Sequence, residues 1–250
     1  MRGLAAADVL AVAVLALLAV AGFAWAAIAI RRFPFRPAQT ALYGLNYFLT
    51  HVLWGLRVEG RLATAPGQGA VIVCNHRSSI DPCFIAVLVR RPVHWMVARE
   101  FCEHWAFRWF LRTCEVIPVS RSGNDTAAMR AAIRKAASGG LVGMFPEGRI
   151  NTTDALLLPA RAGAVRVAIE AGVPIVPCYL EGSPYDGAAV SPLFMPARVR
   201  LSIGQPIQLP DCGRRGGDRE MLDTLTRRVM RAIAHLAGSE EFAPEIVRRK

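Results

Sequence analysis

The chain has 250 residues, which is enough for one domain with a full hydrophobic core. It combines a hydrophobic fraction of 53% with a formal net charge of +11, and this combination favours a membrane surface as a partner. The basic residues are scattered and no nucleic-acid-binding motif is present, so we expect no nucleic-acid partner.

The first apolar run, Val9 to Ile30, contains no charged residue. It is long enough to cross a hydrocarbon layer of about 30 Å, so we predict an N-terminal transmembrane helix. Three arginines follow it between positions 31 and 36, whereas Arg2 and Asp8 precede it. The positive-inside rule therefore predicts that the rest of the chain faces the cytoplasm, and we expect the protein in the cell inner (plasma) membrane. A cleaved signal peptide is the alternative, but the apolar run continues past the possible cleavage site at Ala24-Trp25-Ala26.

A second apolar stretch runs from Ala41 to Val58 and is interrupted by polar residues. Its many aromatic residues favour a helix that lies in or against the membrane interface. A helix packed on the domain core is equally compatible with the pattern. We assign residues 1–57 to the transmembrane helix plus this interfacial helix, 58–237 to the catalytic domain and 238–250 to a loose C-terminal tail.

From residue 70 onward, apolar strand patterns alternate with helical patterns. Strands are predicted at 70–74, 93–98, 115–119, 141–145, 173–179 and 197–203, and helices from 82 and at 104–112, 125–138, 161–171 and 219–237. This order predicts an α/β fold with a central mostly parallel or mixed sheet flanked by helices. The six cysteines show no C-x-x-C spacing, so we expect reduced thiols and no metal site.

The segment Asn75 to Pro82 places His76 and Asp81 five positions apart, directly after the apolar strand 70–74. We expect Asp81 to cap a helix whose first residue is Pro82. One tight turn would then bring carboxylate and imidazole together, so that Asp81 fixes the tautomer and His76 acts as a general base. A surface His followed by a simple helix cap is the alternative. The chain has no G-x-S-x-G elbow, so the attacking hydroxyl would belong to a substrate.

Two further clusters follow predicted strands, where open α/β sheets build their sites. Ile117 to Arg121 ends with an arginine, and Phe145 to Arg149 ends with Glu147, Gly148 and Arg149. Two guanidinium groups at one edge suit a phosphate, because each can donate two parallel hydrogen bonds.

These blocks resemble the glycerolipid acyltransferases typified by 1-acyl-sn-glycerol-3-phosphate acyltransferase, whose hallmark is H-x-x-x-x-D. The order of blocks also matches: Asn75–Pro82, Ile117–Arg121, Phe145–Arg149 and Val173–Pro177, within a resemblance that runs from about Val58 to Gly204. Arg99-Glu100-Phe101 is similar to the basic-Glu-aromatic step found before the second block. One departure is that Arg149 follows Gly148 directly, where the family commonly has Glu-Gly-Thr-Arg.

The resemblance implies that His76 is the base and Asp81 its orienting partner. It implies that Arg121, Glu147, Gly148 and Arg149 bind the phosphate and glycerol of a lysophospholipid acceptor. An acyl group would pass from acyl-CoA or acyl carrier protein, as co-substrate, to the hydroxyl of 1-acyl-sn-glycerol-3-phosphate, which gives phosphatidic acid. No metal or redox cofactor is required, and membrane lipids are expected partners.

Three alternatives stay open at this point. The acceptor could be another lyso-lipid, as the shortened third block allows. A Cys74–His76 acyl-enzyme is conceivable, because residues two apart on a strand share a face. Finally, the chain could be a membrane lipid-binding protein without catalysis, although His76, Asp81, Glu147 and Arg149 are all present.

Overall fold

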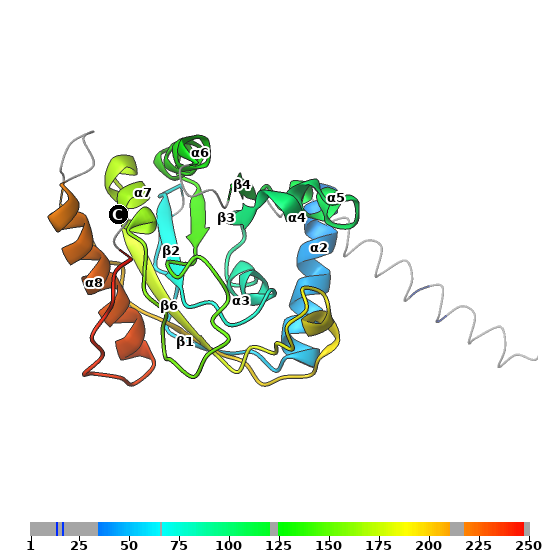
Figure 1. Ribbon diagram of the computed structural model, residues 1–250. Coiled ribbons are helices and arrows are strands. Elements are labelled where there is room, and N and C mark those ends of the chain that lie inside the picture. Colours follow the sequence, from blue (N-terminus) through cyan, green and yellow to red (C-terminus); the bar gives the residue numbers. More distant parts are fainter. Residues whose placement is uncertain are drawn as a thin grey trace, which may run out of the picture.

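Figure 1 presents the computed structural model, in which a seven-stranded sheet lies between two layers of helices. The described residues are Val14, Leu17, 35–65, 67–120, 125–210 and 218–247. The strand order is β1-β7-β6-β2-β5-β3-β4. All neighbouring strands are parallel except β6 and β7, which are antiparallel. The predicted α/β fold with a mixed central sheet is therefore confirmed.

The strands are β1 (Arg57–Glu59), β2 (Ala70–Cys74), β3 (Val93–Ala98), β4 (Ile117–Val119), β5 (Leu141–Met144), β6 (Ile175–Glu181) and β7 (Arg200–Ile203). The helices are α2 (Pro37–Phe48), α3 (Asp81–Ala86), α4 (Arg99–Glu103), α5 (Trp105–Thr113), α6 (Thr126–Ala137), α7 (Gly163–Ala171) and α8 (Arg219–Leu236). A π-helical turn, η1 (Leu49–Leu53), continues α2, and a 3₁₀ turn, η2 (Ser191–Phe194), precedes β7. Strand β1 is too short for the sequence pattern to reveal.

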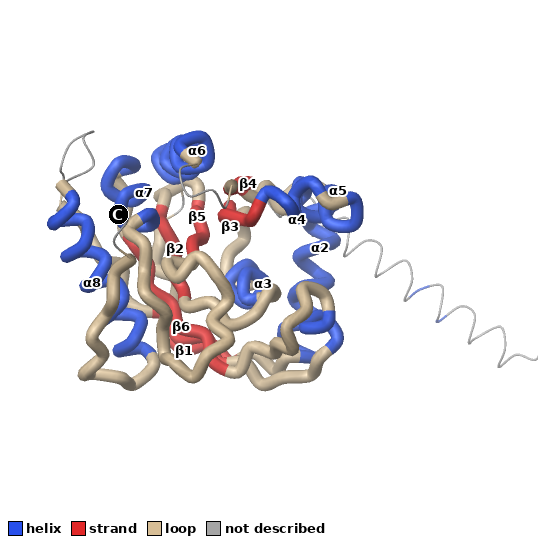
Figure 2. Tube along the Cα trace, viewed as in Figure 1, coloured by secondary structure: helices blue, strands red, loops and turns tan. Residues whose placement is uncertain are grey.

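The central strand β2 is buried along its whole length because both of its faces are covered. Val71 and Val73 contact the core under α6, α7 and α8, whereas Ile72 and Cys74 face the core that contains Phe84 of α3. Figure 2 shows helices on both sides of the strands, as this alternation requires. A strand covered on both faces explains why 70–74 is continuously apolar.

The functional residues follow from this topology. Strands β2 and β5 are parallel neighbours, with Val73 opposite Met144 in register. The segments that leave their carboxyl ends, 75–82 and 145–149, therefore lie at the same edge of the sheet, where open α/β proteins bind ligands.

The C-terminal segment is attached over part of its length, contrary to the expected loose tail. Ala160 donates a 2.8 Å hydrogen bond to the carbonyl of Glu245, and Val247 donates one of 2.9 Å to the carbonyl of Ala160. Arg227 of α8 also donates to the carbonyl of Pro244. Residues 244–247 thus pack beside the loop that precedes α7.

The expected membrane helix, Val9 to Ile30, lies outside the described residues apart from Val14 and Leu17, which are helical. Within the part of the chain that the structure describes, no helix is both long and apolar enough to span a membrane. The transmembrane prediction is therefore neither supported nor contradicted.

Candidate active site

His76 and Asp81 form a hydrogen-bonded pair at the carboxyl end of β2. Nδ1 of His76 lies 2.9 Å from Oδ2 of Asp81. The carboxylate only accepts, so Nδ1 carries the hydrogen and Nε2 is left as the basic nitrogen. The side chain of Asp81 is fully buried, whereas that of His76 is 16% exposed. The imidazole is thus held from the protein side and open on its outer side, as a general base requires.

The position of Asp81 differs by one residue from the expected helix cap. Asp81 is the first residue of α3, Ile80 precedes it as N-cap, and no side chain caps the helix. Oδ2 of Asp81 instead accepts from the backbone amides of Arg77 (2.7 Å) and Ser78 (2.8 Å). The carboxylate therefore organises the whole turn between His76 and itself. Its Oδ1 is buried and has no hydrogen-bond partner among the described residues.

Asn75 fixes the end of β2 to β6. Its side-chain amide donates to the carbonyl of Leu180 (2.8 Å), and its Oδ1 accepts from the amide of Leu180 (2.7 Å). Asn75 is buried, so both bonds exclude water. A two-point clamp directly before His76 limits how far the base can shift. Sequence reasoning quoted Asn75 without assigning it this role.

Glu147 contacts backbone amides with both carboxylate oxygens. Oε1 accepts from the amide of His76 (2.9 Å), and Oε2 accepts from the amide of Leu158 (2.8 Å). The residue is 4% exposed. Burial raises the pKa of its carboxyl group, although the two backbone amides and His76 oppose that rise. The expected contact of Glu147 with the acceptor stays untested, and the geometry favours a role in positioning His76.

We therefore expect Glu147→Gln to lower kcat more than it raises KM. Glutamine can accept from one of the two amides, but its NH₂ group would face the other donor. His76 would then lose its fixed backbone position, while the arginines expected to bind the acceptor stay in place. The measurement is steady-state kinetics with the acceptor varied. A large rise in KM at unchanged kcat would instead indicate that Glu147 binds the acceptor.

An aromatic stack supports the inner face of the imidazole. The rings of His76 and Phe145 are nearly parallel, with centroids 3.8 Å apart and an interplanar angle of 6°. Trp95 of β3 stacks on the other side of Phe145, at 4.8 Å and 17°. Trp95 is buried, so the stack joins the base to the core. The sequence placed Phe145 in the third block but gave no signal that it would meet His76.

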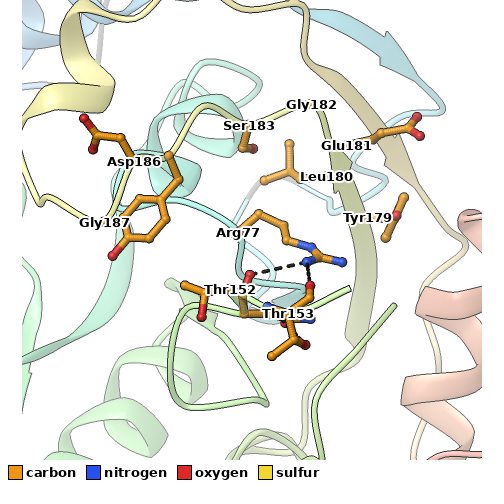
Figure 3. A pocket seen from close by; sticks show the side chains of 12 residues that line it. Arg77, Thr152, Thr153, Tyr179, Leu180, Glu181, Gly182, Ser183, Asp186 and Gly187 are labelled. Carbon is orange, nitrogen blue, oxygen red and sulfur yellow. Dashed lines mark hydrogen bonds between the residues drawn. The ribbon is translucent and has the colours of Figure 1, made fainter. Parts of the chain in front are cut away.

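Arg77 clamps the loop that follows the third block. Its guanidinium donates to the carbonyls of Asn151, Thr153, Ala155 and Leu156. Figure 3 shows the guanidinium of Arg77 bonded directly to this loop at the wall of a hollow of about 660 Å³. Polar side chains dominate the lining, among them Thr152, Ser183 and Asp186. The lining includes Arg77 but not His76, so the hollow borders the turn between His76 and Asp81 without including the imidazole.

The expected phosphate-binding residues lie partly outside the described chain. Residues 121–124 are not described, so the position of Arg121 stays a prediction. Gly148 has a φ of 70°, which favours glycine, and Arg149 is exposed. Sequence reasoning missed Arg161, an exposed residue whose guanidinium lies about 3.5 Å from where a Cβ of Gly148 would stand. Gly148 therefore has two arginines near it: Arg149, the next residue in the chain, and Arg161, thirteen positions after Gly148.

Cys74 is unsuited to nucleophilic attack. It is fully buried, and burial raises the pKa of its thiol well above the usual value. Its Sγ donates to Oδ1 of Asn75, and its side chain faces the core with Phe84. A neutral, buried thiol cannot reach a substrate as a thiolate. The geometry thus favours attack by an acceptor hydroxyl over a Cys74 acyl-enzyme.

Comparisons with known proteins agree with this geometry. The model of the family described as Acyltransferase matches residues 55–181. The 1-acyl-sn-glycerol-3-phosphate acyltransferase of Bacillus subtilis is 27% identical over 158 residues, which cover 63% of this chain and 76% of that protein. The human 1-acyl-sn-glycerol-3-phosphate acyltransferase alpha is 34% identical over 143 residues, which cover 53% of this chain and 49% of that protein.

A solved structure shares the fold. The crystal structure of the 1-acyl-sn-glycerophosphate (LPA) acyltransferase PlsC from Thermotoga maritima matches with a TM-score of 0.62 and 21% identity. The match covers 84% of this chain and 83% of that one. The chain also covers 61% of the Streptococcus pneumoniae 1-acyl-sn-glycerol-3-phosphate acyltransferase, at 25% identity. The shared architecture thus extends beyond the segment that the family model matches.

Proposed function

Because the chain belongs to the acyltransferase family, we propose that it acylates the free hydroxyl of 1-acyl-sn-glycerol-3-phosphate and so forms phosphatidic acid. The acyl donor is the thioester of coenzyme A or of acyl carrier protein. The observation that carries this proposal is the buried Asp81 carboxylate 2.9 Å from Nδ1 of a partly exposed His76. The named relatives act on this acceptor according to their descriptions, which supports it as the first choice.

The reaction needs two proton transfers, one from the acceptor hydroxyl to His76 and one from His76 to the leaving thiolate. Nε2 of His76 takes the proton of the acceptor hydroxyl as its oxygen attacks the thioester carbonyl carbon. Asp81 stabilises the imidazolium that forms, as the acid does in a Ser-His-Asp triad. When the tetrahedral intermediate collapses, the C–S bond breaks and the thiolate leaves with the electron pair. The proton on Nε2 then passes to the thiolate, which regenerates the neutral base.

We propose that the cations around Gly148 hold the acceptor phosphate. Arg149 is exposed, and within the described residues its guanidinium has no ion pair or hydrogen bond. The guanidinium of Arg161 lies beside Gly148, and Arg121 belongs to the same predicted group. Guanidinium groups suit a phosphomonoester dianion because they donate in pairs. A different lyso-lipid acceptor is the second candidate, because the third block lacks the residue that the family commonly has before its arginine.

An acceptor panel with both donors tests this function. The purified full chain is given labelled acyl-CoA or acyl carrier protein with lysophosphatidic acid, lysophosphatidylcholine or lysophosphatidylglycerol. We expect the phosphomonoester to be the preferred acceptor. Preference for lysophosphatidylcholine or lysophosphatidylglycerol, which are phosphodiesters, would show that the acceptor is another lyso-lipid. Lipid binding without transfer to any acceptor would identify a non-catalytic lipid-binding protein.

Arg149→Ala should raise KM for lysophosphatidic acid with little change in kcat. A charge-assisted hydrogen bond contributes about 1.5–3 kcal/mol, which corresponds to a rise in KM of roughly tenfold to a hundredfold. Arg130→Ala on α6 is the matched control, because Arg130 is an exposed arginine on another part of the domain. Equal effects of the two substitutions would show that Arg149 acts through general charge only.

We further propose that the protein is bound to the inner membrane with its domain in the cytoplasm. The uncharged run from Val9 to Ile30 and the arginines after it support this topology. A cysteine introduced at Gly187, in an exposed loop, and treated with a thiol-reactive reporter would test it. We expect labelling only after the inner membrane is opened. Labelling of intact spheroplasts would place the domain outside.

A further inference from the structure

Three aromatic rings form a continuous stack that ends at the imidazole of His76. The ring of Phe145 lies between this imidazole, at a centroid distance of 3.8 Å, and the indole of Trp95, at 4.8 Å. The interplanar angles are 6° and 17°, so all three rings are nearly parallel. Trp95 is buried at the inner end, and the side chain of His76 is partly exposed at the outer end. The face of the imidazole that Phe145 covers is therefore closed to water.

The backbone leaves room for this stack at Gly143. Strands β3 and β5 are parallel neighbours (Figure 2), and Trp95 stands directly opposite Gly143 in their register. A Cβ at Gly143 would lie 2.4 Å from Cδ2 of the indole, which is too close for any side chain. The indole therefore lies across β5 where a side chain is missing. Phe145 comes two positions after Gly143, on the same face, and so meets the indole there.

The indole of Trp95 contributes its ring and not its N–H group. Its Nε1 is buried and has no hydrogen-bond partner among the described residues. A buried, unpaired N–H lowers stability, and phenylalanine at this position would avoid that cost. What tryptophan adds over phenylalanine is a larger ring with a stronger negative potential over its face.

The spacing of His76 and Phe145 suits a charged imidazolium better than a neutral imidazole. Neutral aromatic pairs prefer offset or edge-to-face arrangements with centroids about 4.5–7 Å apart, because the negative faces of two rings repel each other. A cation over a ring face, within about 6 Å of the centroid, is attracted by the same negative potential. The imidazole becomes a cation only when Nε2 takes a proton. The stack therefore favours the protonated form, which is the form produced as the acceptor hydroxyl attacks.

We propose that Phe145, backed by Trp95, stabilises the imidazolium of His76 in the transition state through a cation–π interaction. Asp81 binds the ion at Nδ1 and Phe145 at the ring face, so neither contact blocks Nε2. An interaction that is stronger in the transition state than in the ground state raises kcat. Phe145 thus acts on the rate through His76 and not by contacting the acceptor. The inference rests on the proposed role of His76 as the base.

The charged groups beside His76 contact its edge or its backbone. Oδ2 of Asp81 lies at Nδ1, and Oε1 of Glu147 accepts from the backbone amide of His76. The guanidinium of Arg77 donates to carbonyls of the loop 151–156. A change in the potential over the ring of Phe145 therefore alters what the covered face meets and leaves these charge contacts in place.

Fluorinated phenylalanines in place of Phe145 test the proposal, because each ring fluorine weakens the negative potential over the face with little change in ring size. With one, two and three fluorines, kcat of the purified full chain should fall stepwise while acceptor KM stays constant. The expected loss at three fluorines is about two- to thirtyfold, the size of a cation–π interaction. The same series at Phe84 is the matched control, because Phe84 is buried and meets Trp54 edge-on, at 5.4 Å and 74°. Constant kcat across the Phe145 series, or an equal fall in the Phe84 series, would overturn the proposal.

A titration without substrate separates this inference from the proposed function. In the full chain with carbon-13 at Cε1 of its histidines, the signal that is absent from His76→Ala reports protonation of this ring directly. Three fluorines on Phe145 should move the midpoint of that titration to lower pH by about 0.3 to 1.5 units, because a weaker attraction for the cation lets the proton leave sooner. An unchanged midpoint would overturn the cation–π contact even in an active enzyme. A shifted midpoint in a protein that transfers no acyl group would support the contact and reject only the proposed function.

Discussion

His76→Ala should lower kcat by about 10² to 10⁴ with little effect on acceptor KM, because general base catalysis contributes a factor of that size. Nδ1 of His76 is bonded to Asp81, so Nε2 is the ring nitrogen that can take a proton. Alanine has no group to take the proton from the acceptor hydroxyl. The stack with Phe145 and Trp95 would lose its outer ring, but both aromatic side chains remain in the core. The measurement is steady-state transfer of labelled acyl groups at matched protein concentration.

His235→Ala is the control for this substitution. His235 lies on α8, is well exposed, and pairs with Glu240 at 2.8 Å, so its removal also deletes an imidazole next to a carboxylate. We expect no change in kcat there. A His76→Ala enzyme within a factor of about three of the wild type would exclude His76 as the base.

Asp81→Asn should lower kcat by roughly 10³, by analogy with the loss of about 10⁴ when the orienting acid of a catalytic triad becomes an amide. Oδ2 of Asp81 accepts from His76 and from the amides of Arg77 and Ser78. An NH₂ group at that position would face three donors, and an oxygen there would leave the NH₂ group at the buried Oδ1 position. Either orientation leaves polar groups unpaired, which costs about 1–3 kcal/mol each.

Kinetics and stability together separate the two consequences of Asp81→Asn. Denaturant unfolding gives the loss in folding free energy, and assays well below the unfolding midpoint give the loss in kcat. Asp218→Asn serves as control, because Asp218 caps α8 through the amide of Met221 without contacting a histidine. If Asp81→Asn lowers the free energy of unfolding but leaves kcat normal, Asp81 has a structural role only.

The sequence predicted the contact between His76 and Asp81 because its geometry is local. A buried strand followed by H-x-x-x-x-D leaves one turn in which Asp81 can reach back to His76. The exact helix start was wrong by one residue, since Asp81 satisfies the turn and not the helix end. The alternation of strands and helices likewise predicted the α/β sheet from the period of apolar residues alone.

The remaining parts of the site depend on contacts between distant segments. Phe145 stacks on His76, 69 positions earlier, and Arg161 lies beside Gly148 only because the intervening loop folds back. The two amides bound by Glu147 belong to His76 and Leu158, and backbone donors leave no signal in a sequence. Asn46 appeared to interrupt an apolar helix, whereas its side chain donates to the carbonyl of Cys83 and so attaches α2 to α3.

The most direct test of the account follows thiol release from acyl-CoA by the full chain, with lysophosphatidic acid or with its 2-deoxy analogue as acceptor. The account predicts thiol release matched one-for-one by phosphatidic acid when the hydroxyl is present, near-zero release with the 2-deoxy analogue, and loss of release in His76→Ala. Equal release with both acceptors, with the acyl label left on the protein, would contradict direct transfer to an acceptor hydroxyl activated by His76.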